Sequence, residues 1–532
     1  MGRITNIYAL TALASIGGLL FGFDVSSMSA IITTPNYLVF FGSPSATVPC
    51  ATRPGALCNP GPSAGLQGII TASMSAGALV SSLLSGLVAD HFGRRPAIFL
   101  GCILWIIGSL LLCTVQNVVI LIIGRVLGGA CVGLCSAQVP VYLSELAPPR
   151  LRGRLIGCVQ WGIAWGICGF WCISVAAGFI GNRIDGEQDG RSTMSFRLPW
   201  GLRLVPATVL MVLVPMMPES PRYLIAKGRN DEALGILAKV HAKGDTSSAS
   251  VQKEYHEIVR DIEESQADGS GYVDLFRGGN LWRTHIALFV QIWSSLTGLN
   301  IMTFYMTYVC QMAGLLGTSA LVLTGFQYVV LVIMTIPAML WVDRLGRRPL
   351  LLIGSTIMAI CLFSIAALMS TRGHPWPDSP NAVVSWKVDG LASHIILFFS
   401  YLFVAAFAPT WGPVSWIYVP ELIGNRLRSK AGSLATAAGW MFNFALGYAV
   451  PPAFHNVRWK TYVIFGCFCV AMTVHVALVF PETAGRSLEE VEEIFASGVP
   501  AWRTRARSTR IVDVGGDATR GSDEDKLDSS VI

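Results

Sequence analysis

Long apolar runs alternate with short polar segments along most of the chain. Twelve runs are long enough to cross the hydrocarbon core of a bilayer, which takes about 20 apolar residues per helix. They lie near residues 7–32, 66–88, 97–115, 118–143, 154–180, 199–217, 284–312, 318–342, 349–370, 391–418, 431–451 and 460–480. The first run contains Asp24 and lacks a small-residue cleavage site, so we interpret it as a retained helix rather than a signal peptide. The pattern predicts an all-α membrane protein with twelve transmembrane helices.

The composition supports this class and excludes several others. Hydrophobic residues make up 53% of the 532 residues and charged residues 13%, against about 25% charged residues in soluble domains. The net charge of +6 comes from short Lys and Arg clusters between apolar runs, without the basic patch that nucleic acid requires. The sequence contains no metal-ligand cluster, nucleophile triad or nucleotide loop, so we expect no enzyme activity, no cofactor and no metal.

The polar segments predict the orientation. Lys and Arg concentrate in the loops after the second, fourth, sixth, eighth and tenth runs, which by the positive-inside rule are cytoplasmic, as are both termini. The one long polar insert, residues 218–281, has helical periodicity and separates an N-terminal half (1–217) from a C-terminal half (282–486). Residues 487–532 form a predicted cytoplasmic tail, disordered towards its end. In the predicted first outer loop, Cys50 and Cys58 could be free thiols or a disulfide, and both alternatives stay open.

Three motifs occur twice in the same order. The stretch DHFGRRPAIFLG at 90–101 matches DRLGRRPLLLIG at 343–354. The stretch VYLSELAPPRLRGR at 141–154 matches IYVPELIGNRLRSK at 417–430, and PESPR at 218–222 is echoed by PETAGR at 481–486. Repeats in the same order predict two six-helix pseudo-repeats.

These motifs carry a family resemblance. Together with GGLLFGFD (17–24), GRVLGG (124–129) and APTWGPVSWIYVPE (408–421), they resemble the signature set of the sugar porter family of the major facilitator superfamily, in particular its fungal hexose and pentose branch. The resemblance covers about residues 7–495. It implies a plasma-membrane transporter that works by alternating access around a central site, with a small-molecule substrate and a proton as its partners. Neither nucleic acid nor an obligate protein partner is expected.

Two full charges lie inside apolar runs. Asp24 in the first run and Arg125 in the fourth are predicted at a similar depth. An isolated charge there costs several kcal/mol, so each needs a partner. We interpret them as a proton-coupling pair in which Asp24 takes up a proton and releases Arg125. A static structural ion pair is the alternative.

Acidic and basic residues also recur in the repeated motifs at the predicted cytoplasmic ends of the helices. By resemblance, they hold these ends together when the site faces outward. The predicted gate residues are Asp90, Arg94, Arg95, Glu145, Arg152, Glu219 and Arg222 in the first half, and Asp343, Arg347, Arg348, Glu421, Arg428, Glu482 and Arg486 in the second. A solvated rim of weakly interacting loop charges is the alternative.

The predicted substrate site differs from the family pattern. The positions assigned to it are Gln160, Gln291, Ser294, Ser295, Asn300, Trp411, Trp416 and Gly439. By resemblance, Gln160 and Asn300 are amides that read sugar hydroxyls, and Trp411 and Trp416 line the cavity. The family's Gln pair is Ser294 and Ser295 here, and two family Asn positions are Leu331 and Gly439.

Each lost hydrogen-bond partner of a buried hydroxyl costs about 1–3 kcal/mol, so a hexose is expected to bind poorly in the usual pose. Either the substrate is a molecule other than a hexose, or glucose binds in another orientation. The preferred function is proton-driven uptake of a sugar or a sugar-like polyol or acid. The alternatives are a facilitator or exporter of a non-sugar metabolite and a nutrient sensor that does not transport.

Overall fold

The computed structural model of the protein describes residues 4–32, 34–42, 48–49, 57–58, 61–148, 151–184, 193–267, 272–315, 318–376, 383–423, 427–486, 488–497 and 500–504. The side chains of Arg152 and Asn300 lie outside this description, as do Cys50 and the side chain of Cys58. The predictions made for these four residues therefore stay predictions.

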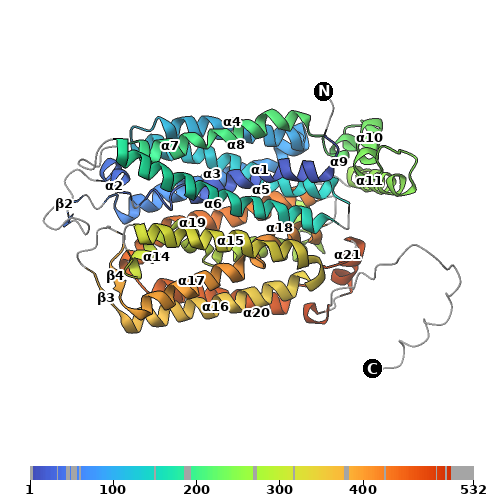
Figure 1. The fold of residues 1–532 in the computed structure, drawn as a ribbon. Helices are drawn as coiled ribbons and strands as arrows, with labels where there is room; N and C mark the ends of the chain where they lie inside the picture. The colour runs from blue at the N-terminus through green and yellow to red at the C-terminus, as the bar shows by residue number, and fades with distance from the viewer. Residues whose placement is uncertain are drawn as a thin grey trace.

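The described residues form a bundle of long, roughly parallel helices in two halves (Figure 1). The first half contains α1 (Ile7–Ser26), α3 (Ala64–Phe92), α4 (Arg94–Cys113), α5 (Val118–Leu146), α6 (Arg152–Ile184), and α7 (Met194–Leu202) followed by α8 (Leu204–Leu213). The second contains α12 (Asn280–Leu296), α13 (Leu299–Phe304), α14 (Met306–Met312), α15 (Thr318–Leu345), α16 (Arg347–Arg372), α17 (Leu391–Phe407), α18 (Trp411–Leu422), α19 (Arg428–Asn456) and α20 (Lys460–Val479).

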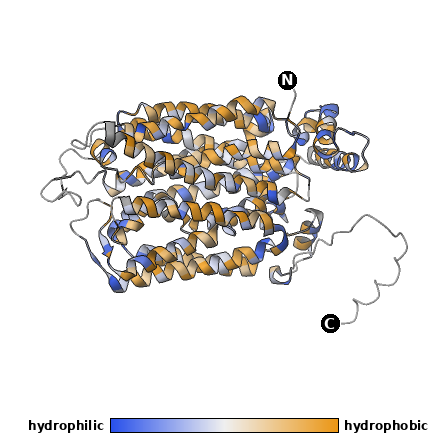
Figure 2. Ribbon diagram, in the orientation of Figure 1, coloured by the Kyte–Doolittle hydropathy of each residue, from blue (hydrophilic) through white to orange (hydrophobic). Residues whose placement is uncertain are grey.

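Ten helical segments among the described residues are long and apolar enough to cross a membrane. The segment α12–α14 and the helix α19 supply the remaining two of the twelve predicted spans. Hydrophobic residues predominate along the middle of the bundle, and hydrophilic residues are concentrated towards its ends (Figure 2). The prediction of an all-α membrane protein with twelve transmembrane helices is confirmed.

The two ends of the bundle carry different elements (Figure 1). One end, called the linker end below, carries η1 (Val214–Met216), α9 (Pro221–Ala226), α10 (Asn230–His241), α11 (Ala249–Ala267), η2 (Tyr272–Phe276), α21 (Leu488–Ala496) and η3 (Ala501–Arg503). The opposite end, called the hairpin end, carries α2 (Pro35–Phe41) and two antiparallel pairs, β1 (Val48–Pro49) with β2 (Leu57–Cys58) and β3 (Gly373–Pro375) with β4 (Trp386–Val388). α10 and α11 fall on the insert predicted to be helical.

One transmembrane segment is broken at the level of the substrate site. α12 ends at Leu296, and Gly298 then adopts φ +96°, a left-handed conformation that glycine tolerates best. The Thr297 hydroxyl donates to the Ser294 carbonyl at 2.8 Å, which satisfies one acceptor at the helix end. The chain resumes as α13 and, after Tyr305, as α14. This break lets residues 299–304 turn into the space between the two halves.

Small residues bring helices of the two halves close together. A Cβ atom on Gly68 of α3 would lie 2.5 Å from the Tyr448 carbonyl oxygen of α19, and one on Gly447 would lie 3.3 Å from the Ala72 Cα. Such close backbone approach is typical of membrane helix pairs, where packing rather than the hydrophobic effect drives association. α3 and α19 therefore form one seam between the halves.

Candidate functional site

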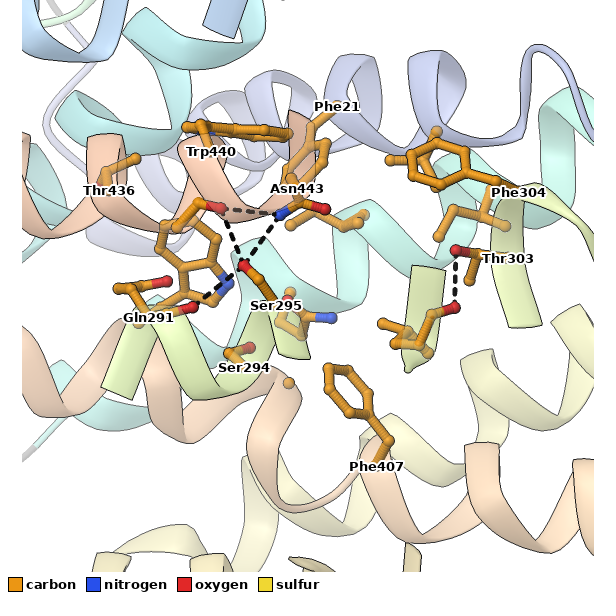
Figure 3. Close-up of a pocket in the computed structure, with 18 of the residues that line it drawn as sticks. Phe21, Gln291, Ser294, Ser295, Thr303, Phe304, Phe407, Thr436, Trp440 and Asn443 are labelled. Atoms are coloured by element: carbon orange, nitrogen blue, oxygen red, sulfur yellow. Dashed lines mark hydrogen bonds between the residues drawn. The ribbon is translucent and has the colours of Figure 1, made fainter. Parts of the chain in front are cut away.

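A cavity of about 90 Å³ lies between the two halves, near the middle of the bundle (Figure 3). The first half contributes Phe21, Val25, Gln160, Ile163 and Ile167, and the second half contributes the rest of the lining. All the lining residues are uncharged. A volume of this size holds several water molecules or a compact polar ring.

Hydroxyl and amide groups of α12 and α19 form the polar wall of the cavity (Figure 3). The Ser295 hydroxyl lies 3.0 Å from the Gly439 carbonyl oxygen and accepts a hydrogen bond from Asn443 Nδ2 at 3.0 Å. Gln291 Nε2 donates to the Ser415 carbonyl at 3.1 Å. In both amides the protein holds the NH2 end, so the amide oxygen is the end that can accept from a ligand hydroxyl.

Aromatic rings form the apolar wall. The ring of Phe21 lies 5.2 Å from that of Trp440 and 6.5 Å from that of Trp416, centroid to centroid. Trp440 Nε1 donates to the Ser136 hydroxyl of the other half at 3.2 Å. Aromatic faces beside hydrogen-bonding groups suit a ligand with one apolar and one polar side.

Most of the residues predicted for the substrate site line this cavity. Gln160, Gln291, Ser294, Ser295, Trp416 and Gly439 all do, as does the substituted position Leu331. The expectation for Trp411 is wrong. It is fully buried at the start of α18 and donates its indole N–H to the Leu351 carbonyl of α16 at 3.0 Å, so it packs against a neighbouring helix instead of the cavity.

Sequence reasoning missed several lining residues, including Thr303, Thr436 and Asn443. Asn443 follows Gly439 by four residues, and residues four apart lie on the same face of a helix. The helical spacing alone could therefore have indicated it. Thr303 depends on the break before α13, which the apolar pattern does not reveal.

The halves contact each other at both ends of the bundle. At the hairpin end, the Thr307 hydroxyl donates to the Ser29 carbonyl at 3.0 Å. At the linker end, the hydroxyls of Ser85 and Ser433 lie 3.0 Å apart. The two halves thus touch each other at both ends of the bundle, on either side of the cavity.

A buried ion cluster lies in the first half. Asp24 of α1 is fully buried and has two arginine partners: Arg203 NH2 lies 3.0 Å from its Oδ1, and Arg125 NH1 lies 4.0 Å away. Arg125 donates to the Ser27 hydroxyl at 2.8 Å and to the Thr71 carbonyl at 3.4 Å. The structure thus brings the predicted pair together, but the nearest partner of Asp24 is Arg203.

Arg203 separates α7 from α8 and was missed in the sequence. It is the one charged residue of the apolar run 199–217, so the criterion that selected Asp24 and Arg125 also applies to it. In the structure, its side chain is fully buried.

The repeated motifs build two equivalent networks at the linker end, one in each half. In the first, Arg94 lies 3.3 Å from both Asp90 and Glu145, and the backbone N–H groups of Arg94 and Arg95 donate to Glu219 at 3.0 and 3.3 Å. Burial raises the pKa of the Glu219 carboxyl, and these N–H donors counteract the shift. Arg222 acts electrostatically on Glu145.

The second network repeats the first. Arg347 bonds Glu421 at 2.6 and 3.0 Å and Asp343 at 2.9 Å, and the N–H groups of Arg347 and Arg348 donate to Glu482 at 2.8 and 3.0 Å. Buried Arg428 begins α19. The two networks are thus equivalent in position and in chemistry.

Pairing of these charges across opposing helix ends stays a prediction, because the side chain of Arg152 lies outside the described residues. The ion pairs given above join residues of the same half, because each arginine at the start of α4 or α16 reaches the acids of its own motif set. The Arg95 and Arg348 side chains donate to backbone carbonyls, those of Pro215 and Ala477. Across the halves, Asp343 lies against the first turn of α6, where a Cβ atom on Gly153 would be 2.5 Å from its Oδ1.

Comparisons with known proteins agree with this architecture. Residues 10–495 match the family model described as "Sugar (and other) transporter". The chain is 40% identical over 508 residues to a high-affinity glucose transporter of Kluyveromyces lactis, covering 94% of this chain and 87% of that one. It is 39% identical over 524 residues to the MFS glucose transporter mfs1 of Aspergillus flavus, covering 97% and 94%.

Solved structures give the same picture. The proton:xylose symporter XylE bound to 6-bromo-6-deoxy-D-glucose superposes with a TM-score of 0.76 at 26% identity, covering 92% of this chain and 99% of that one. The inward-open conformation of XylE from E. coli gives 0.68 at 27% identity, with the same coverage. The chain therefore belongs to the sugar transporter family of the major facilitator superfamily and is a multi-pass membrane transporter.

Proposed function

We propose that the protein imports a neutral hexose of the glucose class together with a proton. The transporter alternates between outward- and inward-facing states around the central cavity. It lies in the plasma membrane, with the linker end and both termini in the cytoplasm. In this orientation, the hairpin-end contact forms the outer gate and the linker-end contact forms the inner gate.

One observation carries this proposal: α1 lines the cavity and also holds the buried carboxylate. Phe21 and Val25 face the cavity, whereas Asp24, next to Val25, faces the arginines of the first half. The substrate therefore meets only neutral groups, and the proton site is separate from it. A movement of α1 that follows protonation would change both sites together.

The arrangement of amides supports a hexose. Gln291 precedes Ser295 by four residues, and Asn443 follows Gly439 by four, so both lie one helical turn from a position where an amide is missing. The amides missing at Ser295 and Gly439 are thus replaced from the same helix faces. Glucose would then bind in a shifted orientation, and the names of the fungal relatives point to the same substrate class.

The ion cluster supports proton coupling. A carboxylate that is fully buried among membrane helices is costly unless it is paired, and such residues mark ion and proton pathways. When the site opens outward, Asp24 takes up a proton, which weakens its attraction to the arginines and releases α1. After the transporter turns inward, the proton is lost and the pairs re-form.

An anionic substrate is a second candidate, because relatives at 29% identity include a gluconate transporter of Schizosaccharomyces pombe and a quinate permease of Neurospora africana. The uncharged cavity lining favours the neutral sugar, since a buried carboxylate needs a paired charge. Facilitated diffusion without a proton remains a further alternative.

Uptake in a transport-deficient yeast strain tests these proposals together. Labelled glucose, xylose, gluconate and quinate are supplied at two pH values, with and without a protonophore. We expect glucose to accumulate above its outside concentration, more strongly at the lower pH, and the protonophore to abolish accumulation. Glucose entry that only equilibrates and ignores the protonophore would refute coupling, and preferred uptake of gluconate or quinate would refute the substrate class.

A further inference from the structure

Arg203 is held against Asp24 by contacts on two sides. Its guanidinium Cζ lies 4.2 Å from the ring centroid of Trp105 on α4, and Trp105 Nε1 donates to the Arg203 carbonyl at 3.0 Å. On its other side, Arg203 NH2 lies 3.0 Å from Asp24 Oδ1. The guanidinium therefore lies between the Trp105 ring and the Asp24 carboxylate.

The charges around Asp24 do not cancel. α5 brings Arg125 and the thiol of Cys131, and the α7–α8 junction brings Arg203. α6 carries no acidic or basic residue between Leu155 and Ile180. Tyr37 of α2, together with Tyr305 and Tyr308 around the start of α14, lies on the side of Arg125. The cluster thus has a net charge of +1 with Asp24 ionised and +2 with Asp24 protonated.

The two oxygens of Asp24 have different surroundings. Oδ1 faces both arginines and lies 3.5 Å from the Ser27 hydroxyl. Oδ2 has no hydrogen-bond partner among the described residues, and it lies beside Gly128, where a Cβ atom would be 3.0 Å away. Oδ2 is therefore the oxygen of Asp24 that can take up a proton while Oδ1 stays beside Arg203.

From this geometry we propose that Arg203 is a positioning residue that sets the pH range of proton coupling. Arg203 and Arg125 both lie beside ionised Asp24, so protonation of Asp24 weakens its attraction to two arginines instead of one. This inference depends on the proposed proton coupling, and it adds a function for a residue outside the predicted pair.

The test is the pH profile of initial uptake rates in the transport-deficient yeast strain, with surface protein quantified for every variant. In Arg203→Gln, the midpoint of the fall in uptake with rising pH should move upward by about one to three pH units, the range over which a neighbouring arginine shifts a carboxyl group. Arg203→Lys keeps the charge and should stay near the parent. Trp105→Phe loosens the arginine without removing it and should move the midpoint in the same direction by less.

Arg197→Gln is the matched control, because Arg197 lies on α7 shortly before Arg203 but donates to the Val115 carbonyl at 2.6 Å. Its midpoint should equal that of the parent. An unchanged midpoint in Arg203→Gln overturns the inference, as does an equal shift in Arg203→Lys. If Arg203→Gln does not reach the surface, an unchanged midpoint in Trp105→Phe overturns it. A parent that ignores both pH and protonophore refutes instead the proposed coupling itself.

Discussion

Removing the Asn443 amide is expected to weaken glucose binding through one identifiable hydroxyl. The amide nitrogen is engaged with Ser295, so the amide oxygen is the group offered to the sugar. In Asn443→Ala, the Ser295 hydroxyl keeps the Gly439 carbonyl as its acceptor, and the wall of the cavity should persist. A net loss of about 0.5–1.5 kcal/mol for one hydrogen bond corresponds to a roughly two- to tenfold rise in the KM for glucose.

A double-mutant cycle between protein and ligand isolates this bond. Glucose and each monodeoxyglucose are compared as competitors of uptake in the parent and in Asn443→Ala. One analogue lacks the hydroxyl that contacts Asn443. In the parent, this analogue should bind more weakly than glucose, whereas in Asn443→Ala it should bind as tightly as glucose does. Ser400→Ala is the control, because its hydroxyl donates to Ile396 of its own helix and lies outside the cavity lining. If every analogue loses affinity equally in both proteins, Asn443 does not bind the sugar.

Three further outcomes are expected. Asp24→Asn should abolish accumulation of glucose while sugar exchange across the membrane survives, and accumulation at the parent level would refute the proton site. Arg347→Ala should reduce transport far more than Arg348→Ala. The first substitution removes the arginine that pairs with the Glu421 carboxylate, whereas the second removes only a side-chain hydrogen bond to the Ala477 carbonyl. Equal uptake by the two variants at matched surface amounts would contradict the network. Gly439→Asn, although it restores an amide of the family pattern, should weaken glucose competition because a Cβ atom added there would lie 3.4 Å from Gln291 Cβ, so the new side chain competes with Gln291 for space; tighter competition would show that the cavity tolerates both amides.

The sequence predicts the helices well because membrane helices need long apolar runs, and the length of each run in the sequence indicates the length of the helix. It does not predict how a run bends. The apolar pattern predicts one helix over 284–312. In the structure, Gly298 divides this segment, and Thr303 beyond the break lines the cavity. The surroundings of the break, where the Phe465 ring of α20 lies against Gly298, are not contained in a local pattern.

Partners of charged residues were predicted less well than the charged residues themselves. Asp24 and Arg125 stand out because a charge in an apolar run is costly. Which arginine comes nearest to Asp24 depends on how α1, α5 and the α7–α8 junction pack together, and the structure brings Arg203 nearest. The gate charges show the same limit: their motifs are evident in the sequence, but Arg94 and Arg347 pair within their own halves.

In the substrate site, too, the sequence predicted many of the residues but not all of their surroundings. Gln160, Ser295 and Gly439 were assigned from motif positions and do line the cavity, because the motifs fix the register of each helix. Trp411 was assigned in the same way but faces α16, since α18 begins at that residue after a break. Asn443 was missed although it lies one helical turn from Gly439.

Proton movement induced by the sugar tests directly whether glucose enters the cell together with a proton. Glucose is added to a lightly buffered suspension of energised, transport-deficient yeast cells that express the parent or Asp24→Asn, and the external pH is recorded together with labelled glucose entry. The parent should make the medium transiently alkaline, with about one proton entering per glucose through the single proton site at Asp24, and Asp24→Asn should produce no such change. Glucose entry into parent cells without any proton entry would contradict this prediction.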